Sequence, residues 1–214
     1  MLDKLKEIRE DITTECPYLV GDVAHNLDLL GEQAGTGKVY NGKNGKGVCE
    51  IDLQALICVM VHIEPKTIIE IGTYTGISTC ALAKVFKDLD MDLHITTIEY
   101  NKDLYNVAIE NAKRLGLDNI EFINGNSDIE LPKLYSRNAD VIFLDGDPLS
   151  LEYNMAINNF DKVVGHDMTH LGTKLVAPRG AFFDQTIRYG INGFKGIILQ
   201  TGECGIGYIH KDND

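Results

Sequence analysis

The sequence contains few cysteines, and they follow no spacing typical of a metal site or a disulfide framework. Its five cysteines are an odd number without any Cys-x-x-Cys pair: Cys16, Cys49, Cys58, Cys80 and Cys204. This scatter argues against a zinc site and against a disulfide-linked secreted domain, and it favours free thiols in a reducing compartment. We therefore expect a cytoplasmic protein.

Long apolar runs and a surplus of basic residues are absent as well. No apolar stretch approaches the roughly 18 residues that a membrane-spanning helix requires. The N-terminal residues MLDKLKEIREDI are charged and amphipathic, unlike a signal peptide. The 32 acidic side chains outnumber the 20 basic ones, which gives a formal net charge of −12. Such a surface repels phosphate backbones and anionic lipids, so we expect neither a nucleic acid nor a membrane as partner.

Two glycine-containing stretches lack the spacing of the common nucleotide-binding motifs. In GEQAGTGKVYNGKNGKG, residues 31–47, a Walker A loop is excluded because Glu32 stands where glycine is needed and Val39 replaces Ser or Thr. We interpret this stretch as a mobile loop. In EIGTYTG, residues 70–76, Tyr74 occupies the place of the middle glycine of GxGxxG. A nicotinamide dehydrogenase is therefore disfavoured.

The size and composition indicate one ordinary globular core. The chain has 214 residues, of which 44% are hydrophobic and 24% charged, as is usual for a single soluble domain. Leu2, Leu5, Ile8 and Ile12 recur at helical spacing and predict a leading helix. We divide the chain into residues 1–47, a helical segment and mobile loop that serves as substrate lid or dimer contact, and a main domain over residues 48–214.

Short apolar runs alternate with helical patterns through the main domain. After a helix over 52–63, we predict strands at 67–71, 94–98, 120–123, 140–144 and 162–164, with helices at 77–89, 103–115, 129–135, 151–158 and 181–189. Runs such as TIIEI and VIFL suit strands that are buried on both faces of a parallel sheet. FKGIILQTGECGIGYIHK, residues 194–211, predicts two antiparallel strands around a tight turn. We predict an α/β fold: a doubly wound, mostly parallel, seven-stranded sheet with helices on both faces and a C-terminal antiparallel hairpin.

Polar residues follow the ends of these predicted strands. By itself EIGTYTG is as consistent with a structural turn as with a ligand site. Glu99, however, follows the second strand, where a carboxylate can accept both hydroxyls of a ribose. GNSD, residues 125–128, follows the third strand, where it can frame an adenine edge. Because ligands bind at the carboxyl ends of such strands, these residues favour a cofactor site.

The combined pattern resembles the class I S-adenosylmethionine-dependent methyltransferases. The features are E-x-G-x-x-x-G-x-S from Glu70 to Ser78, an acid ending the second strand, D-G-D at residues 145–147 and the terminal hairpin. The resemblance covers residues 48–211. IIEIGTYTGIST and DVIFLDGDPLSLEY further resemble small-molecule O-methyltransferases of the catechol and caffeoyl-CoA type and their sugar and natural-product relatives. The resemblance implies methyl transfer to a hydroxyl of a small molecule, and a homodimer is common in the family.

The resemblance also implies which residues hold S-adenosylmethionine. Glu70 would take the methionine ammonium, Ser78 and the helix amides the carboxylate, and Glu99 the ribose. The implied cofactor site comprises these residues and their neighbours in the strand-end loops: Glu70, Gly72, Thr73, Tyr74, Gly76, Ser78, Glu99, Tyr100, Asn126, Ser127 and Asp145.

A Mg²⁺ site is implied only in part. Asp145 and Asp167 end the fourth and fifth strands, and their carboxylates are ligands that Mg²⁺ prefers. Such an ion would orient the acceptor oxygen and lower its pKa. The family usually has a third ligand, Asn or Asp, directly after the strand-five aspartate, but Met168 stands here, and Pro148 replaces the lysine of catechol-type enzymes. Metal dependence is therefore left open, with Asp147, His170 or water as substitutes.

Without that lysine another catalytic base is needed. His166 and His170 flank the predicted site, and a neutral imidazole near pH 7 can take a hydroxyl proton. We predict these two histidines and Asp145 as catalytic residues. For Arg179 we expect a solvated loop charge rather than a guide for an acidic substrate.

Two other functions remain open at this point. Met168 and Pro148 are compatible with a non-catalytic domain that binds the cofactor but has lost the catalytic end of the site. An enzyme that methylates nitrogen or carbon is also compatible, because nothing in the acceptor region distinguishes the acceptor atom.

Overall fold

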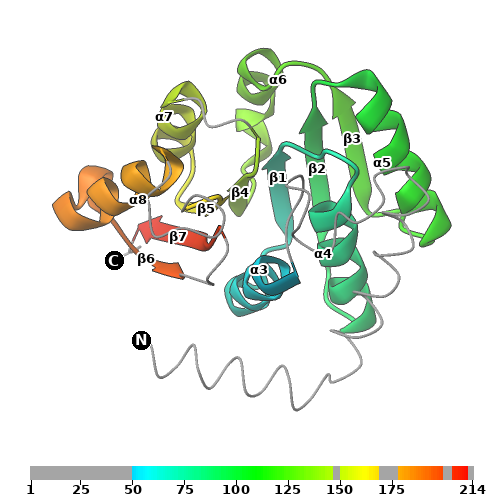
Figure 1. Cartoon of the computed structure of the whole chain (residues 1–214), viewed down its shortest axis with the longest axis horizontal. Helices are drawn as coiled ribbons and strands as arrows, with labels where there is room; N and C mark the ends of the chain where they lie inside the picture. The colour runs from blue at the N-terminus through cyan, green and yellow to red at the C-terminus, as the bar shows by residue number, and fades with distance from the viewer. Residues whose placement is uncertain (1–49, 147–149, 169–177, 200–203, 212–214) are drawn as a thin grey trace.

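The computed structural model describes residues 50–146, 150–168, 178–199 and 204–211 (Figure 1). The helix and loop expected over residues 1–47 lie outside these ranges. The described elements follow the predicted alternation: α3 (Glu50–Ile63), β1 (Thr67–Ile71), α4 (Ile77–Asp88), β2 (His94–Glu99), α5 (Lys102–Arg114), β3 (Ile120–Asn124), α6 (Ser127–Leu134), β4 (Val141–Leu144), α7 (Ser150–Asn159), β5 (Lys162–His166), α8 (Pro178–Tyr189), β6 (Phe194–Leu199) and β7 (Ile206–Lys211).

The strands form one seven-stranded sheet in the order β3-β2-β1-β4-β5-β7-β6. β1 to β5 pair in parallel, and β7 lies antiparallel between β5 and β6. The chain runs outward from β1 to β3 and then returns to place β4 on the other side of β1. This order confirms the predicted doubly wound fold with its C-terminal hairpin, and it puts the topological switch point between β1 and β4.

Two apolar layers cover the sheet, one on each face. α3, α4 and α5 pack on one face, and α6, α7 and α8 pack on the other (Figure 1). Within β1, Ile68 faces the first layer while Ile69 and Ile71 face the second, as the two-residue period of a strand requires. Burial on both faces explains why β1 and β4 are apolar throughout except for Glu70 and Thr67.

Local sequence sets the ends of the helices that follow β2 and β3. The side chain of Asn101 accepts hydrogen bonds from the backbone N–H groups of Asp103 and Leu104 and so caps α5. Asn126 caps α6 in the same way by accepting from the N–H of Asp128. None of the helices in the described ranges is long and apolar enough to cross a membrane.

Gly72, which follows β1, allows two loops to pass in close contact. Its φ is +93°, and a Cβ atom there would lie 2.5 Å from the backbone nitrogen of Gly146, after β4. The sequence predicted that this glycine makes room for a ligand, and the structure adds the β4 loop as a second reason. The ends of β1 and β4 therefore meet closely at the switch point.

We expect Gly72→Ala to lower the free energy of unfolding by about 2–4 kcal/mol, because an L side chain is strained at this φ and clashes with backbone. Gly116→Ala is the matched control, since Gly116 also has a positive φ, +63°, but a Cβ there meets nothing within 4 Å. Gly116→Ala should lower the free energy of unfolding by only about 1 kcal/mol. Urea unfolding of both variants measures the difference, and equal losses would contradict the close contact.

Candidate active site

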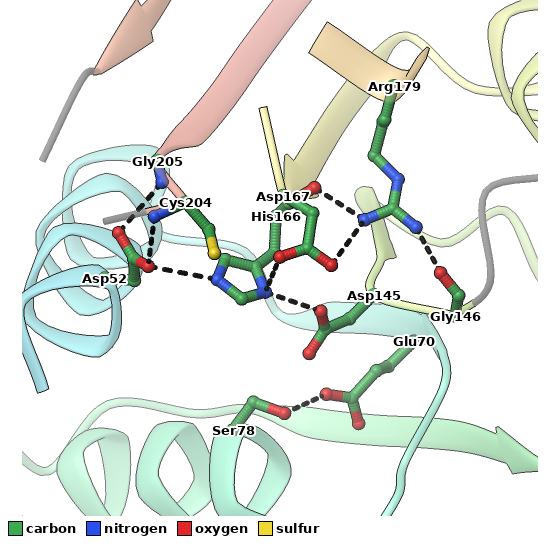
Figure 2. Close-up of polar contacts among 10 residues, drawn as sticks. All are labelled: Asp52, Glu70, Ser78, Asp145, Gly146, His166, Asp167, Arg179, Cys204 and Gly205. Carbon is green, nitrogen blue, oxygen red and sulfur yellow. Dashed lines mark hydrogen bonds and ion pairs between the residues drawn. The ribbon is translucent and has the colours of Figure 1, made fainter. Parts of the chain in front are cut away.

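Four acidic side chains and one histidine gather at the carboxyl edge of the central strands. Glu70 belongs to β1, Asp145 follows β4, and His166 and Asp167 end and follow β5. Asp52 reaches the same place from α3 (Figure 2). Because parallel strands present their carboxyl ends at one edge, residues from distant parts of the sequence meet here.

Glu70 is buried and receives hydrogen bonds from three hydroxyl groups. Ser78 and Thr97 donate to its carboxylate, each at 2.7 Å, and Thr79 donates as well. Burial raises the pKa of Glu70 to about 7, although these hydroxyls work in the opposite direction. Thr73 joins the same network through Thr97. The hydroxyl of Ser78, which the sequence assigned to the cofactor, therefore serves first to hold Glu70.

Glu99 joins the turn after β1 to the end of β2. Its Oε2 accepts from the backbone N–H of Tyr74 and its Oε1 from that of Asn101, both at 2.7 Å. Tyr74 adopts a left-handed conformation with φ 51°, which aims its N–H at this carboxylate. Each carboxylate oxygen has a further lone pair, so Glu99 can still accept hydrogen bonds from two neighbouring hydroxyls. Tyr100, the next residue, is exposed.

The loop after β3 is organised by a carboxylate that the sequence did not reveal. Ser127 donates a hydrogen bond to Glu152, which lies buried in α7. Asn126 points back to cap α6. Both residues were predicted to flank an adenine, and the structure fixes their positions without testing that role. No local motif marks Glu152, because its partner is 25 residues away in the sequence.

Some buried side-chain oxygens in the strand-end loops have no hydrogen-bond partner, which bears on the expected site for S-adenosylmethionine. Among the described side chains, Thr75, Asn119 and Asp128 each keep a buried oxygen without a hydrogen-bond partner, and Asn119 lies outside the strand-end loops, directly before β3. Thr75 lies in the turn expected to hold the methionine end, and Asp128 lies in the loop expected to frame the adenine. Buried polar atoms in folded proteins nearly always have a partner, so these two atoms suit a polar ligand.

His166 lies between three carboxylates. Its Nδ1 is 2.8 Å from Asp145 Oδ1 and 3.4 Å from Asp167 Oδ1, and its Nε2 is 3.2 Å from Asp52 Oδ2 (Figure 2). Burial by itself lowers the pKa of His166, but the carboxylates, Asp145 first, outweigh it and raise the pKa to about 10. At neutral pH the ring is therefore charged, whereas the predicted base needs a neutral ring.

Arg179 connects the ends of β4 and β5 from the start of α8. Its guanidinium donates to the carbonyl oxygen of His166 at 2.5 Å and to that of Gly146 (Figure 2). Arg179 is only 3% exposed, so the expectation of a solvated loop charge is wrong. A single arginine in APRG gives no local signal for such a contact, since its partners are 13 and 33 residues away in the sequence.

Met168 occupies the core instead of the polar edge. It is 1% exposed and packs near Gly207 and Gly165 against the second apolar layer. The position that usually supplies the third metal ligand in the family therefore supplies none here. His170, Asp147 and Pro148 lie outside the described residues, and the prediction of His170 as a base stays a prediction.

A family model gives independent information on this region. Residues 69–171 match the model described as a methyltransferase domain. This part of the chain is therefore similar to a methyltransferase domain. Its match begins within β1 and runs past the end of β5, so it includes every strand end that contributes to the site.

Two curated relatives of the chain come from plants. Caffeoyl-CoA O-methyltransferase 3 of Nicotiana tabacum is 30% identical over 161 residues, which cover 71% of this chain and 64% of that enzyme. The caffeoyl-CoA O-methyltransferase of Medicago sativa is 30% identical over the same length and is covered to 62%. The chain thus spans somewhat less than two thirds of the length of these relatives.

Solved structures share the fold of this chain. An O-methyltransferase from Bacillus cereus in complex with SAH has a TM-score of 0.69 at 19% identity, over 87% of this chain and 91% of that chain. An SAH-bound methyltransferase from Podospora anserina has a TM-score of 0.66 at 19% identity, over 88% of each chain. At these identities the likeness establishes the fold alone.

We expect Arg179→Met to lower the free energy of unfolding by about 2–4 kcal/mol, because two buried carbonyl groups lose a charged donor. Arg188→Met in the same helix is the control. Arg188 pairs with Asp184 on the surface of α8, and such pairs contribute less than about 0.5 kcal/mol. Urea unfolding measures both losses; a small loss for Arg179→Met would mean that the buried guanidinium does not hold the two strand ends.

Proposed function

We propose that the protein is an S-adenosylmethionine-dependent methyltransferase that methylates a hydroxyl group of a small molecule. The observation that carries this proposal is the placement of Glu70, Glu99 and Asp145 at the ends of three neighbouring strands, β1, β2 and β4. The caffeoyl-CoA O-methyltransferase relatives and the SAH-bound structural neighbours support it.

The cofactor would lie across the switch point with its charged end near β1. Glu70, held by the hydroxyl of Ser78, would receive the methionine ammonium, and the first amides of α4 with Thr75 would hold the carboxylate. Glu99 would accept the ribose hydroxyls. The backbone of the β1–α4 turn and the α6 loop would complete the site, through Gly72, Thr73, Tyr74, Gly76, Tyr100, Asn126 and Ser127. When bound, S-adenosylmethionine supplies an electrophilic methyl group on a positively charged sulfur.

Asp145 and Asp167 would receive the acceptor. Their side chains are 13% and 46% exposed, while that of His166 is 4% exposed and lies behind them. An acceptor hydroxyl would therefore meet the carboxylates first, and Asp145 is positioned to orient that hydroxyl and accept its proton. Holding the reacting atoms about 3 Å apart can itself supply several kcal/mol of the barrier.

The expected partners follow from the same features. The net charge of −12 supports a small-molecule acceptor and no nucleic acid or membrane partner. We further propose that residues 1–47 cover the acceptor or form a homodimer contact beside the cofactor-binding domain of residues 48–214, and that the protein is cytoplasmic.

A non-catalytic cofactor-binding protein is the second candidate. It is favoured by the engagement of both His166 ring nitrogens with carboxylates, which leaves this histidine unsuited to take a proton. Incubation with methyl-labelled S-adenosylmethionine and a panel of hydroxyl, amine and carbon acceptors separates the candidates. Label in a hydroxyl compound supports the leading proposal; cofactor binding without transfer to any acceptor supports the second.

We expect Glu99→Ala to weaken SAH binding by about 10–100-fold, because a charged acceptor contributes about 1.5–3 kcal/mol when it is paired. Isothermal calorimetry measures the dissociation constant. Glu110→Ala is the control, since Glu110 lies on the outer surface of α5 in an exposed ion pair with Arg114. Unchanged SAH affinity in Glu99→Ala, with the fold intact by circular dichroism, would remove Glu99 from the cofactor site.

Cofactor affinity should also depend on pH through Glu70. Its pKa of about 7 means that the carboxyl group is mostly protonated at pH 6, and a bound ammonium group lowers that pKa. Binding therefore releases a proton below pH 7, and affinity should fall by up to about tenfold per pH unit as pH decreases from 7. Above pH 7 the carboxylate is already charged, so this dependence should disappear.

Calorimetry of SAH binding in buffers of different ionisation enthalpy measures the released proton. At pH 6 we expect the wild type to release close to one proton for each SAH bound. Glu70→Gln should release none from residue 70. Asp145 and Cys80 are the other titratable groups close enough to influence or sense Glu70, and burial raises the pKa of the Cys80 thiol to about 12. Equal proton release in wild type and Glu70→Gln would contradict the assignment.

A further inference from the structure

Three possible metal ligands converge at the ends of β4 and β5. They are Asp145 Oδ1, His166 Nδ1 and one carboxylate oxygen of Asp167, which all lie within 4.8 Å of one another. The nitrogen is 2.8 Å from the Asp145 oxygen and 3.4 Å from the Asp167 oxygen. Neighbouring ligands of an octahedral divalent ion, each about 2.1 Å from it, are about 3 Å apart. The two distances from Nδ1 are therefore close to those between neighbouring ligands of one ion.

The imidazole is oriented for this role by Asp52. Nε2 faces Asp52 Oδ2 at 3.2 Å, and the two carboxylate oxygens of Asp52 accept the backbone N–H groups of Cys204 and Gly205 at 3.1 and 3.0 Å (Figure 2). Asp52 is fully buried in α3. A histidine that binds a metal nearly always donates its other ring N–H to a carboxylate or carbonyl group. Asp52 fulfils that condition and directs Nδ1 toward Asp145 and Asp167.

Cys204 forms a second group with Asp52 and His166, and this group is a weaker candidate. Both oxygens of Asp52 already accept backbone amides, and Oδ2 faces the imidazole nitrogen directly. A divalent ion there would have to separate these atoms. The Nδ1 side, where the carboxylates of Asp145 and Asp167 are 13% and 46% exposed, is therefore the better candidate.

The backbone at this point is held in place from two directions. Arg179 binds the carbonyl oxygens of Gly146 and His166, one residue beyond Asp145 and one before Asp167. Asp167 adopts φ 59°, a left-handed conformation that costs energy for a residue with a side chain and persists only when its surroundings enforce it. The backbone that carries the two carboxylates is thus fixed, and Arg179 Nη1 also lies 4.0 Å from Asp167 Oδ2.

We propose that His166 is the third protein ligand of a one-histidine, two-carboxylate metal site with Asp145 and Asp167, and that Asp52 is its positioning residue. The proposal rests on the methyltransferase function proposed above. It places the third ligand one residue before Asp167 instead of one residue after it, which leaves Met168 free to pack in the core. A bound ion replaces the proton at Nδ1, while Nε2–H stays on Asp52.

The nitrogen ligand changes which metal the site selects. Mg²⁺ favours oxygen ligands alone, whereas imidazole suits transition metals, and Mn²⁺ and Fe²⁺ accept a mixed set of imidazole and carboxylates. We therefore expect Mn²⁺ or Fe²⁺ to bind better than Mg²⁺. Mg²⁺, which the sequence left open, fits this donor set less well.

Electron paramagnetic resonance with Mn²⁺ tests the proposal on the full chain. We expect the loss of the free-ion signal to correspond to one bound Mn²⁺ per chain. Mn²⁺ should bind at least tenfold more tightly than Mg²⁺ that is added as a competitor. Pulsed measurements on protein labelled with ¹⁵N-histidine should show one directly bound nitrogen. Mn²⁺ bound without a nitrogen coupling would overturn the ligand assignment, and this measurement needs no variant.

Three variants sharpen the test. His166→Asp should lose the nitrogen coupling and shift the preference toward Mg²⁺, because the donor set becomes all oxygen. Asp52→Asn should weaken Mn²⁺ binding by about 10–100-fold, as expected when the partner of a ligating histidine is removed. His94→Ala is the control, since His94 is exposed at the start of β2, and it should change nothing. Unchanged Mn²⁺ affinity in Asp52→Asn, with the fold intact, would overturn the role of Asp52.

The metal proposal and the methyltransferase proposal fail in different ways. If millimolar Mn²⁺ does not bind while SAH still does, the metal site is overturned and the methyltransferase proposal stands. If SAH does not bind, the methyltransferase proposal fails, whatever the metal result.

Discussion

The interaction of His166 with its surrounding carboxylates ties together parts of the chain that are far apart in the sequence. Asp52 from α3, Asp145 after β4 and Asp167 after β5 all face one imidazole. Removing any one of them would leave buried charges with fewer partners, which is costly in a protein interior. The helix that precedes β1 is thereby joined to the carboxyl edge of the sheet, and its position becomes part of the candidate site.

Backbone contacts hold this edge together around the charges. Gly72 and Gly146 bring the ends of β1 and β4 into contact, and Arg179 connects β4 to β5 through two carbonyl groups. On the other side of the switch point, Glu99 joins the β1–α4 turn to the end of β2. The proposed cofactor site and the proposed metal site are therefore built on one continuous series of strand ends, in which a shift of one loop is transmitted to its neighbours.

Most of the fold could be predicted from the sequence, because strands buried on both faces must be apolar and helices between them must show a helical period. The placement of Glu70, Glu99, Asp145 and Asp167 at one edge of the sheet could be predicted because they stand at or next to strand ends. Asp52, Glu152 and Arg179 could not: each acts through partners that are brought near only by the packing of different elements. The raised pKa of His166 could not be predicted for the same reason, since its three carboxylates come from separate segments.

The sequence by itself determined the order of elements, the doubly wound sheet and the edge where polar residues collect, because these depend on local patterns of apolar and polar residues. Only the tertiary structure decided which carboxylates face which donors, whether Arg179 is buried, and why Met168 belongs to the core. Those outcomes depend on distances between residues that are 13 to 153 positions apart in the chain. Electrostatic interactions fall steeply with distance and rise with burial, so their effect on each residue is fixed only when the chain has folded.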